Sequence, residues 1–333
     1  MEKKAISLIS GGLDSAVATK LIIDQGIEVI GLHFTSLFAS KRDRQRGHKA
    51  METAKELGIP IMTKDKGDEY LEIIKNPRYG YGKNINPCID CRIYMLRLTR
   101  ELLPELGASF VITGEVLGQR PMSQRRHTIE LIEKQSELKG LIVRPLSAKL
   151  FPPTIPELEG ILDREKLLAV SGRGRHTQYS LVDQYKLTQF DLPGGGCLLT
   201  DPIFALKFRD LMATDPSYTK KDIELLAIGR HFRVSPSAKL VVARNEREME
   251  QLERFTGASY TQLDPANFRG PRGILKAETP DEKTLLLSAR IIGRYGKDLP
   301  SDPVIEITNG TIRPFAFEMQ EIDSDTLLVQ QEA

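Results

Sequence analysis

The chain lacks the features of a membrane protein or of a disulfide-rich secreted protein. None of its apolar runs approaches the ~20 residues that span a bilayer, and only three of its 333 residues are cysteine. So few cysteines favour metal or redox chemistry over a disulfide framework. The first residues, Met-Glu-Lys-Lys, lead directly into an apolar segment and leave no room for a signal peptide. We therefore expect a cytoplasmic protein without a membrane partner.

An excess of one charge sign is also missing. The formal net charge is only +2, so global charge does not mark a nucleic-acid binder. The cations nevertheless gather in blocks. These are residues 41–49; Arg120, Arg125, Arg126 and His127; Arg173, Arg175 and His176; and Arg230, His231, Arg233, Arg269 and Arg272. One such block alone is typical of a solvated loop, whereas their sum favours an RNA-binding face.

Strands and helices alternate in the first half of the chain. We expect strands at Ala5–Ile9, Glu28–Phe34, Ile59–Thr63, Phe110–Thr113 and Leu141–Val143, and helices at Ala16–Gln25, Arg42–Leu57, Asp68–Ile74, Arg92–Leu106 and Ser123–Lys134. This rhythm predicts an α/β fold with a doubly wound parallel sheet. After Phe151-Pro152-Pro153 we expect a helical stretch that continues to about Thr188.

The length of the chain predicts two domains. The glycine-rich turn Leu192–Cys197 marks a boundary, so we expect one domain at 1–198 and a smaller α+β domain at 199–333. In the second domain we expect helices at Pro202–Thr214, Lys221–Ile228 and Glu282–Tyr295, and strands at Lys239–Ala243, Gly273–Lys276 and Val304–Thr308.

The most informative motif is Ser10-Gly11-Gly12-Leu13-Asp14-Ser15, which lies between the first expected strand and the first expected helix. Its glycines allow a tight turn that leaves backbone N–H groups uncovered. Together with a helix N-terminus, such N–H groups attract phosphate. The Lys of a Walker A motif is missing, which excludes that class of nucleotide loop.

Two further motifs follow. Pro87-Cys88-Ile89-Asp90-Cys91 places a CxxC pair at the start of a helix, and Thr113-Gly114-Glu115-Val116-Leu117-Gly118-Gln119 ends the next strand. With SGGLDS, His33-Phe34 and Arg144-Pro145-Leu146, they resemble the PP-loop catalytic half of tRNA 4-thiouridine synthetases over about residues 1–200. The likeness is greatest to the archaeal type, whose CxxC and one distant Cys hold an iron–sulfur cluster.

The chain departs from that pattern in three places. The N-terminal RNA-binding extension of those synthetases is absent, Pro121-Met122-Ser123-Gln124 replaces their Ala-Ser-Gln-Thr, and a C-terminal domain has been added. The target RNA and the uridine position therefore stay open. We expect the added domain to replace the lost extension. Its candidate RNA-binding cations are Lys207, Arg209, Lys220, Lys221, Arg230, Arg233, Arg269 and Arg272.

The resemblance implies an ATP site with Mg²⁺. Its nucleotide-binding residues would be Ser10, Gly11, Gly12, Leu13, Asp14, Ser15, His33, Phe34, Gly114 and Gln119. Asp14 would place the Mg²⁺–pyrophosphate, Ser15 would donate to phosphate and Gly114 would let adenine approach. Arg144 and Lys149 are further candidates for pyrophosphate, although an exposed basic residue is the default interpretation.

Cys88, Cys91 and Cys197 form the expected metal and catalytic set. A CxxC spacing lets two thiolates share one metal, but three thiolates are incomplete for structural zinc or for a fully ligated cluster. A [4Fe–4S] cluster would keep one iron open for hydrosulfide. A persulfide on Cys91 or Cys197, and zinc with His176 as fourth ligand, are the alternatives.

Together these features predict an ATP-dependent tRNA sulfurtransferase that releases AMP and pyrophosphate. Its partners would be tRNA and a sulfur donor, either sulfide or a cysteine desulfurase, and the oligomeric state stays open, a homodimer included. Two alternatives remain: a PP-loop enzyme that places nitrogen on a small molecule, and a non-catalytic RNA- or ribosome-binding protein.

Overall fold

The computed structural model describes residues 2–192, 197–323 and 327–329. The chain folds into two compact units, Met1–Thr200 (unit 1) and Asp201–Ala333 (unit 2). Residues 193–196 of the expected glycine-rich boundary turn lie outside the described residues. The same holds for the side chains of 41–44 and 46, which belong to the first basic block.

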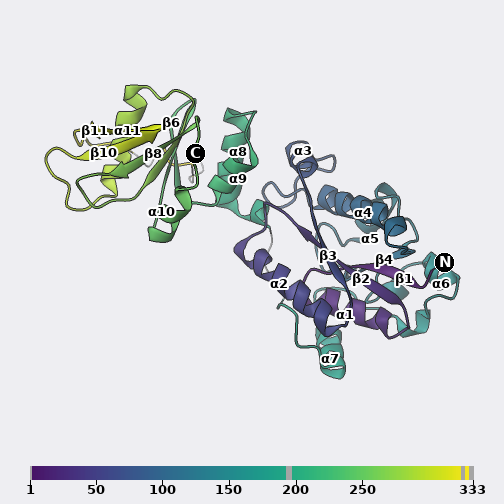
Figure 1. Cartoon of the computed structure of the whole chain (residues 1–333). Coiled ribbons are helices and arrows are strands. Elements are labelled where there is room, and N and C mark those ends of the chain that lie inside the picture. The colour runs from purple at the N-terminus through teal and green to yellow at the C-terminus, as the bar shows by residue number, and fades with distance from the viewer. Residues whose placement is uncertain (1, 193–196, 324–326, 330–333) are drawn as a thin grey trace. The chain divides into compact units, whose positions relative to one another are not determined.

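Within the described residues, unit 1 contains a five-stranded parallel sheet in the order β3-β2-β1-β4-β5 (Figure 1). Its strands are β1 (Lys4–Leu8), β2 (Glu28–Thr35), β3 (Ile61–Asp65), β4 (Phe110–Thr113) and β5 (Ile142–Val143). Its helices are α1 (Leu13–Ile23), α2 (Lys41–Glu56), α3 (Glu69–Lys75), α4 (Cys88–Glu105), α5 (Arg126–Gln135), α6 (Ile155–Leu158) and α7 (His176–Tyr185), with 3-10 turns η1 (Ala148–Leu150), η2 (Arg164–Lys166) and η3 (Leu198–Thr200).

Helices cover both faces of this sheet. Ala5 of β1 packs in a core with α1 and α7, while its neighbour Ile6 packs on the opposite face with α4 and α5. Successive side chains of a strand point to opposite faces, so a strand buried on both sides is continuously apolar. The expected doubly wound fold is therefore confirmed. Ligands in such folds lie at the carboxyl ends of the strands.

The helical stretch expected up to Thr188 is wrong. Between Phe151 and Arg175 the chain is mostly irregular, with only α6 and η2 as short helical segments before α7 begins. Proline at 152 and 153 lacks an N–H donor, which prevents these residues from continuing a helix. Gly172 has a φ of +80°, a left-handed conformation that interrupts any helix there. A loop thus leads into α7.

Unit 2 has a six-stranded antiparallel sheet in the order β11-β10-β8-β9-β7-β6 among its described residues. The strands are β6 (Arg230–Ser235), β7 (Ala238–Val242), β8 (Tyr260–Pro265), β9 (Gly273–Lys276), β10 (Val304–Asn309) and β11 (Thr311–Ala316), and the helices are α8 (Pro202–Thr214), α9 (Lys220–Leu226), α10 (Glu246–Leu252) and α11 (Glu282–Arg294). Helices and strands combine in one unit, as the expected α+β class requires. The sequence did not predict β6, β8, β11 or α10.

Two apolar layers hold unit 2 together. Leu240 of β7 packs in a core with Leu285 and Ile292 of α11, whereas Val241 packs on the other face with Leu252 of α10. Unit 2 therefore has its own core. None of the helices in the described parts of the chain is long and apolar enough to cross a membrane.

Candidate active site

The SGGLDS loop connects β1 to α1 and is organised by its own serines. Ser15 Oγ donates to the carbonyl oxygen of Gly12 at 2.8 Å and lies 3.2 Å from Ser10 Oγ. Gly11 has a φ of +75°, which favours glycine at that position. The side chain of Leu13 is buried in the core, so only its backbone is available to a ligand. The loop presents the N-terminus of α1 at the carboxyl end of β1.

Asp14 is the polar centre of this region. Gln119 Nε2 donates to Asp14 Oδ2 at 2.6 Å, and Gln178 Nε2 donates to Asp14 Oδ1 at 3.2 Å. Arg175 Nε lies 3.9 Å from Asp14 Oδ2, which is too far for a hydrogen bond. Asp14 and Gln119 were expected in the site, and the structure brings them together. Gln178 and Arg175 were not expected there.

Three buried polar atoms beside Asp14 have no partner among the described residues: Gln119 Oε1, Gln178 Oε1 and Arg175 Nε. Leaving such atoms unpaired costs free energy unless a ligand or water satisfies them. Two amide oxygens and a carboxylate are the hard oxygen ligands that Mg²⁺ and its water shell prefer. Arg175 offers a donor to phosphate oxygen. The residues present therefore fit a Mg²⁺–phosphate group.

Gly114 permits a close approach of backbones. A Cβ at this position would lie 2.6 Å from the carbonyl carbon of Asp14 and 2.6 Å from the nitrogen of Ser15. The space that the missing side chain leaves is thus filled by the SGGLDS loop. A role for Gly114 toward adenine stays a prediction.

His33 and Phe34 lie at the end of β2. His33 is buried, and its Nδ1 lies 2.9 Å from the carbonyl oxygen of Ile9, where the protonated nitrogen donates. Phe34 is half-buried and packs against the core on the α4 side of the sheet. These contacts anchor the two strand ends. Nucleotide binding by either residue stays a prediction.

The charged groups of Arg144 and Lys149 are paired with carboxylates of the protein. Arg144 is buried and pairs with Glu115 at 2.9 Å and also with Glu133. Lys149 pairs with Glu165 at 3.0 Å. Glu115 also pairs with Arg92, and these two guanidinium groups lower the pKa of Glu115 against the opposing effect of its burial. The interpretation of Arg144 as an exposed basic residue is therefore wrong.

The three cysteines come from two segments that dock on each other. Cys88 and Cys91 occupy the first turn of α4, and Cys197 immediately precedes η3. The segment after Cys197 is held in place because Ile85 N donates to the carbonyl oxygen of Leu199 at 3.3 Å. Asn84 Nδ2 likewise donates to the carbonyl oxygen of Thr200 at 2.8 Å. The chain thus brings Cys197 to the loop that leads into α4.

The sulfur atoms have donors of their own. Asn86 Nδ2 donates to Cys88 Sγ at 2.9 Å, and Lys66 Nζ donates to Cys91 Sγ at 3.1 Å. Burial, together with the negative charges of the other two thiolates, raises the pKa of Cys197 to about 12. Burial and the charge of Cys91 also raise the pKa of Cys88. Cys88 and Cys197 therefore keep their protons to a higher pH than a free cysteine does.

As arranged, no group of three or more His, Cys, Asp or Glu side chains in the described residues could hold a metal ion. The chemistry of the cysteine neighbourhood nevertheless suits an iron–sulfur cluster. Cysteine sulfurs are soft ligands, and an amide group and an ammonium group donate to two of them. His176 lies at the start of α7 and stays only an alternative as a zinc ligand.

Most candidate RNA-binding cations of unit 2 are engaged inside the fold. Lys207 is buried and donates to the carbonyl oxygen of Gly229 at 3.0 Å, Arg233 pairs with Asp210 at 2.6 Å, and Arg272 pairs with Glu253 at 2.6 Å. These three are not a free RNA-binding surface. Arg269, by contrast, is exposed and has no side-chain partner among the described residues. Lys297 shares these properties.

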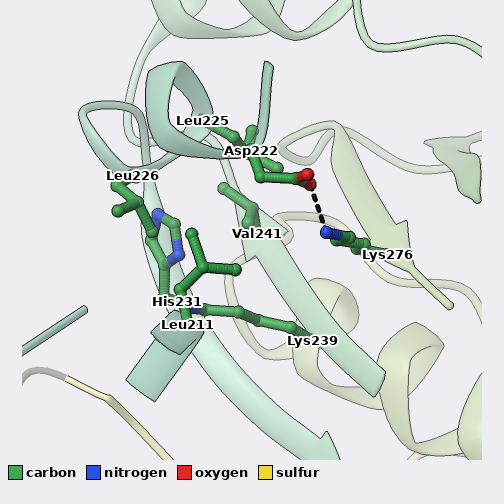
Figure 2. Close-up of a pocket in the computed structure, with 8 residues that line it drawn as sticks. All are labelled: Leu211, Asp222, Leu225, Leu226, His231, Lys239, Val241 and Lys276. Atoms are coloured by element: carbon green, nitrogen blue, oxygen red, sulfur yellow. Dashed lines mark ion pairs between the residues drawn. The ribbon is translucent and has the colours of Figure 1, made fainter. Parts of the chain in front are cut away.

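A pocket in unit 2 also contains cations that are paired inside the fold. Leu211, Asp222, Leu225, Leu226, His231, Lys239, Val241 and Lys276 line it, and the ion pair of Asp222 and Lys276 crosses one end (Figure 2). Lys239 pairs with Asp210 at 2.7 Å. Burial and the charges of Lys207 and Lys239 lower the pKa of His231. Because its lysines are already paired, the pocket has the character of a structural ion-pair cluster.

Comparison with known proteins separates the two units. The family model described as "Thiamine biosynthesis protein (ThiI)" matches residues 1–149. Over these residues unit 1 is similar to that family. This confirms the resemblance to PP-loop tRNA-thiolating enzymes for the N-terminal part of the chain. The model described as "NFACT protein RNA binding domain" matches residues 229–323, within unit 2.

Curated relatives match only in part. The tRNA-specific 2-thiouridylase MnmA of Micrococcus luteus is 33% identical over 132 residues, which are 35% of this chain and 35% of that protein. A probable tRNA sulfurtransferase of Thermococcus kodakarensis is 28% identical over 149 residues, 43% of this chain and 36% of that protein. The chain therefore spans about a third of the length of these two relatives.

Two solved structures overlap partly with the chain. A 4-thiouridine synthetase–RNA complex with bound ATP has a TM-score of 0.36 at 21% identity, over 55% of this chain and 51% of that chain. The U34-tRNA thiolase NcsA from Methanococcus maripaludis with its [4Fe-4S] cluster has a TM-score of 0.35 at 15% identity, over 67% of this chain and 71% of that chain.

Proposed function

We propose that this protein is an ATP-dependent tRNA sulfurtransferase. The observation that carries the proposal is that one unit combines the PP-loop around Asp14 with three cysteines whose segments dock on each other. Phosphate chemistry and sulfur chemistry thus have separate residue sets within the same unit. A PP-loop enzyme that joins nitrogen to a small molecule has no use for the cysteine set.

In the first step, the carbonyl oxygen of a tRNA uridine attacks the α-phosphorus of ATP. The bond between that phosphorus and the bridging oxygen breaks, and pyrophosphate leaves. Backbone N–H groups at the start of α1 bind phosphate oxygens, and Asp14 would hold a Mg²⁺ ion, which would supply positive charge to neutralise them. Gln119 fixes the Asp14 carboxylate through its hydrogen bond of 2.6 Å.

In the second step, sulfur attacks the activated carbon of the base, the carbon–oxygen bond breaks and AMP leaves. Cys88, Cys91 and Cys197 would hold a [4Fe–4S] cluster, which supplies an open iron for hydrosulfide when bound. Lys66 and Asn86 donate to the cysteine sulfurs and hold them in place. Sulfide would supply the hydrosulfide of the cluster route. In the alternative, the persulfide of a cysteine desulfurase passes its outer sulfur to Cys91 or Cys197, the outer sulfur of the new persulfide attacks the base carbon, and another cysteine then displaces the thiouridine sulfur, which leaves a disulfide for an external thiol to reduce.

Unit 2 would bind the tRNA. The RNA-binding family model matches residues 229–323, and exposed cations such as Arg269 and Lys297 lie within that range. Phosphate contacts by such side chains give affinity that is largely independent of sequence.

Mass analysis of tRNA nucleosides from cells with and without this protein tests the proposal. We expect one thiouridine to disappear without the protein and to return with the intact chain, but not with Asp14→Ala. The modified nucleoside will also distinguish thiolation at C2 from thiolation at C4. If every thiouridine persists without the protein, tRNA thiolation is wrong, and small-molecule ligation or non-catalytic RNA binding takes its place.

A further inference from the structure

The N-terminal end of α7 is fixed beside the SGGLDS loop. Gly172 N donates to the carbonyl oxygen of Leu117 at 2.7 Å. Ser147 Oγ accepts from Leu117 N at 3.0 Å and donates to the carbonyl oxygen of Val170 at 2.6 Å. The loop before α7 is therefore tied to the segment that carries Gln119. This fixes the start of α7 before any ligand binds.

The start of α7 has the charge of an anion site. The first N–H groups of a helix have no partner within the helix, and the helix dipole makes this end positive. The first turn of α7 contains no acidic residue, and the side chain of its N-cap residue, Arg175, does not cap it. No carboxylate of α7 itself therefore competes for the first-turn N–H groups.

Buried unpaired atoms provide a second observation at the same place. Gln178 is completely buried, its Nε2 is on Asp14, and its Oε1 has no partner among the described residues. Arg175 Nε is also buried and unpaired there, 3.9 Å from Asp14 Oδ2. A donor and an acceptor left unpaired side by side fit a ligand that both accepts and donates. A phosphate with hydrated Mg²⁺ has both properties.

We propose that the N-terminal end of α7, with Arg175, is a second phosphate-binding element that faces the SGGLDS loop across Asp14. It binds the pyrophosphate part of ATP from the side opposite α1. Gln178 positions Asp14 and accepts from water on the accompanying Mg²⁺. This inference rests on the proposed function only in taking ATP as the source of the pyrophosphate.

Binding of inorganic pyrophosphate with Mg²⁺ to the full chain tests the inference, with AMP as the comparison ligand. Arg175→Ala should weaken pyrophosphate binding about tenfold, because it removes charge-assisted hydrogen bonds, and should leave AMP binding unchanged. Arg175→Lys keeps the charge but loses the planar fork, so its loss should be about threefold. Arg173→Ala is the matched control, since Arg173 is exposed and has no side-chain partner among the described residues. It should bind pyrophosphate like the unchanged chain.

Equal pyrophosphate binding by Arg175→Ala and the unchanged chain would overturn the inference. So would equal losses in Arg173→Ala and Arg175→Ala, because these would indicate a diffuse basic surface. No pyrophosphate binding by the unchanged chain would also overturn it. A failure of the proposed function looks different: the chain would bind pyrophosphate through Arg175, yet tRNA from cells lacking it would keep all its thiouridines.

Discussion

In unit 1, buried polar atoms without a partner gather around Asp14, whereas in unit 2 the two buried lysines each have partners. Gln119, Gln178 and Arg175 leave unpaired atoms at one place in unit 1. Lys207 donates to backbone carbonyls and Lys239 pairs with Asp210. Unpaired groups at the end of a parallel sheet indicate a ligand site, while paired groups inside an antiparallel unit indicate structure. On the proposed function, unit 1 would carry the chemistry and unit 2 would contact the RNA.

The largest expected effect comes from removing the centre of the unit 1 site. Asp14→Ala should lower AMP formation by about a thousandfold, because a metal-holding carboxylate is lost where charge develops on phosphate. Binding of tRNA should not change, since unit 2 is untouched. Labelled ATP and a filter-binding assay measure the two quantities. Comparable losses in both would show that the units do not divide the work as described.

The SGGLDS site illustrates what a sequence can and cannot predict. Asp14 and Gln119 were predicted because short motifs carry their own local geometry. Arg175 and Gln178 lie beside the same carboxylate but come from the start of α7. Gln178 is 164 residues further along the chain than Asp14. Only the tertiary packing of α7 against α1 brings them there. The basic block around Arg175 was visible in the sequence, but it was interpreted as part of an RNA-binding face.

The strands, too, could be predicted from the sequence only in part. Parallel strands buried on both faces are continuous apolar runs, which is why β1 and β4 were predicted well. Exposed β11 and the half-buried β8 of unit 2 carry no such run and were missed. Lys207 was misinterpreted for the same reason: a lysine is normally exposed, and nothing local reveals that backbone carbonyls surround this one.

A second prediction separates sulfur chemistry from nucleotide chemistry within unit 1. Cys197→Ala should abolish thiolation, and the protein purified without oxygen should lose its brown colour and about four irons per chain. ATP binding should remain, because Asp14 and its amide partners do not contact Cys197. Iron analysis and equilibrium ATP binding are the measurements. A colourless, fully active protein with zinc would contradict the cluster and favour the zinc alternative.

In unit 2 the exposed cations should matter more for RNA than the paired ones. Arg269→Ala should weaken tRNA binding about three- to tenfold and reduce the slope of log affinity against log salt by about one. AMP formation at saturating tRNA should stay unchanged. Thr311→Ala, on the exposed edge strand β11, is the matched control within unit 2 and should leave both quantities as they are. If Arg269→Ala leaves the salt slope unchanged, this residue does not contact phosphate.

The smallest effect concerns the stability of unit 2. Burial and neighbouring cations lower the pKa of Lys207 to about 7, whereas the unfolded chain keeps the ordinary value of 10.5. Between these values the unfolded state binds more protons, so the free energy of unfolding should rise with pH. This lysine contributes up to about 1.4 kcal/mol per pH unit.

Lys207→Met should remove that contribution. Denaturant unfolding between pH 7 and pH 9 measures the slope, and the variant should show a flatter profile than the unchanged chain. The slope is the readout because the substitution also leaves the carbonyls of Leu226 and Gly229 without their donor. Identical slopes would show that Lys207 is not held in its neutral form by burial.

The central claim is that ATP consumption in unit 1 is coupled to placing sulfur on tRNA. Its most direct test incubates the anaerobically purified full chain with labelled ATP, Mg²⁺, unmodified tRNA and sulfide, and quantifies nucleotide products and thiouridine together. The account predicts AMP, pyrophosphate and thiouridine in equal amounts, and none of them with Asp14→Ala. ADP and phosphate as products, or AMP without any thiouridine, would contradict it.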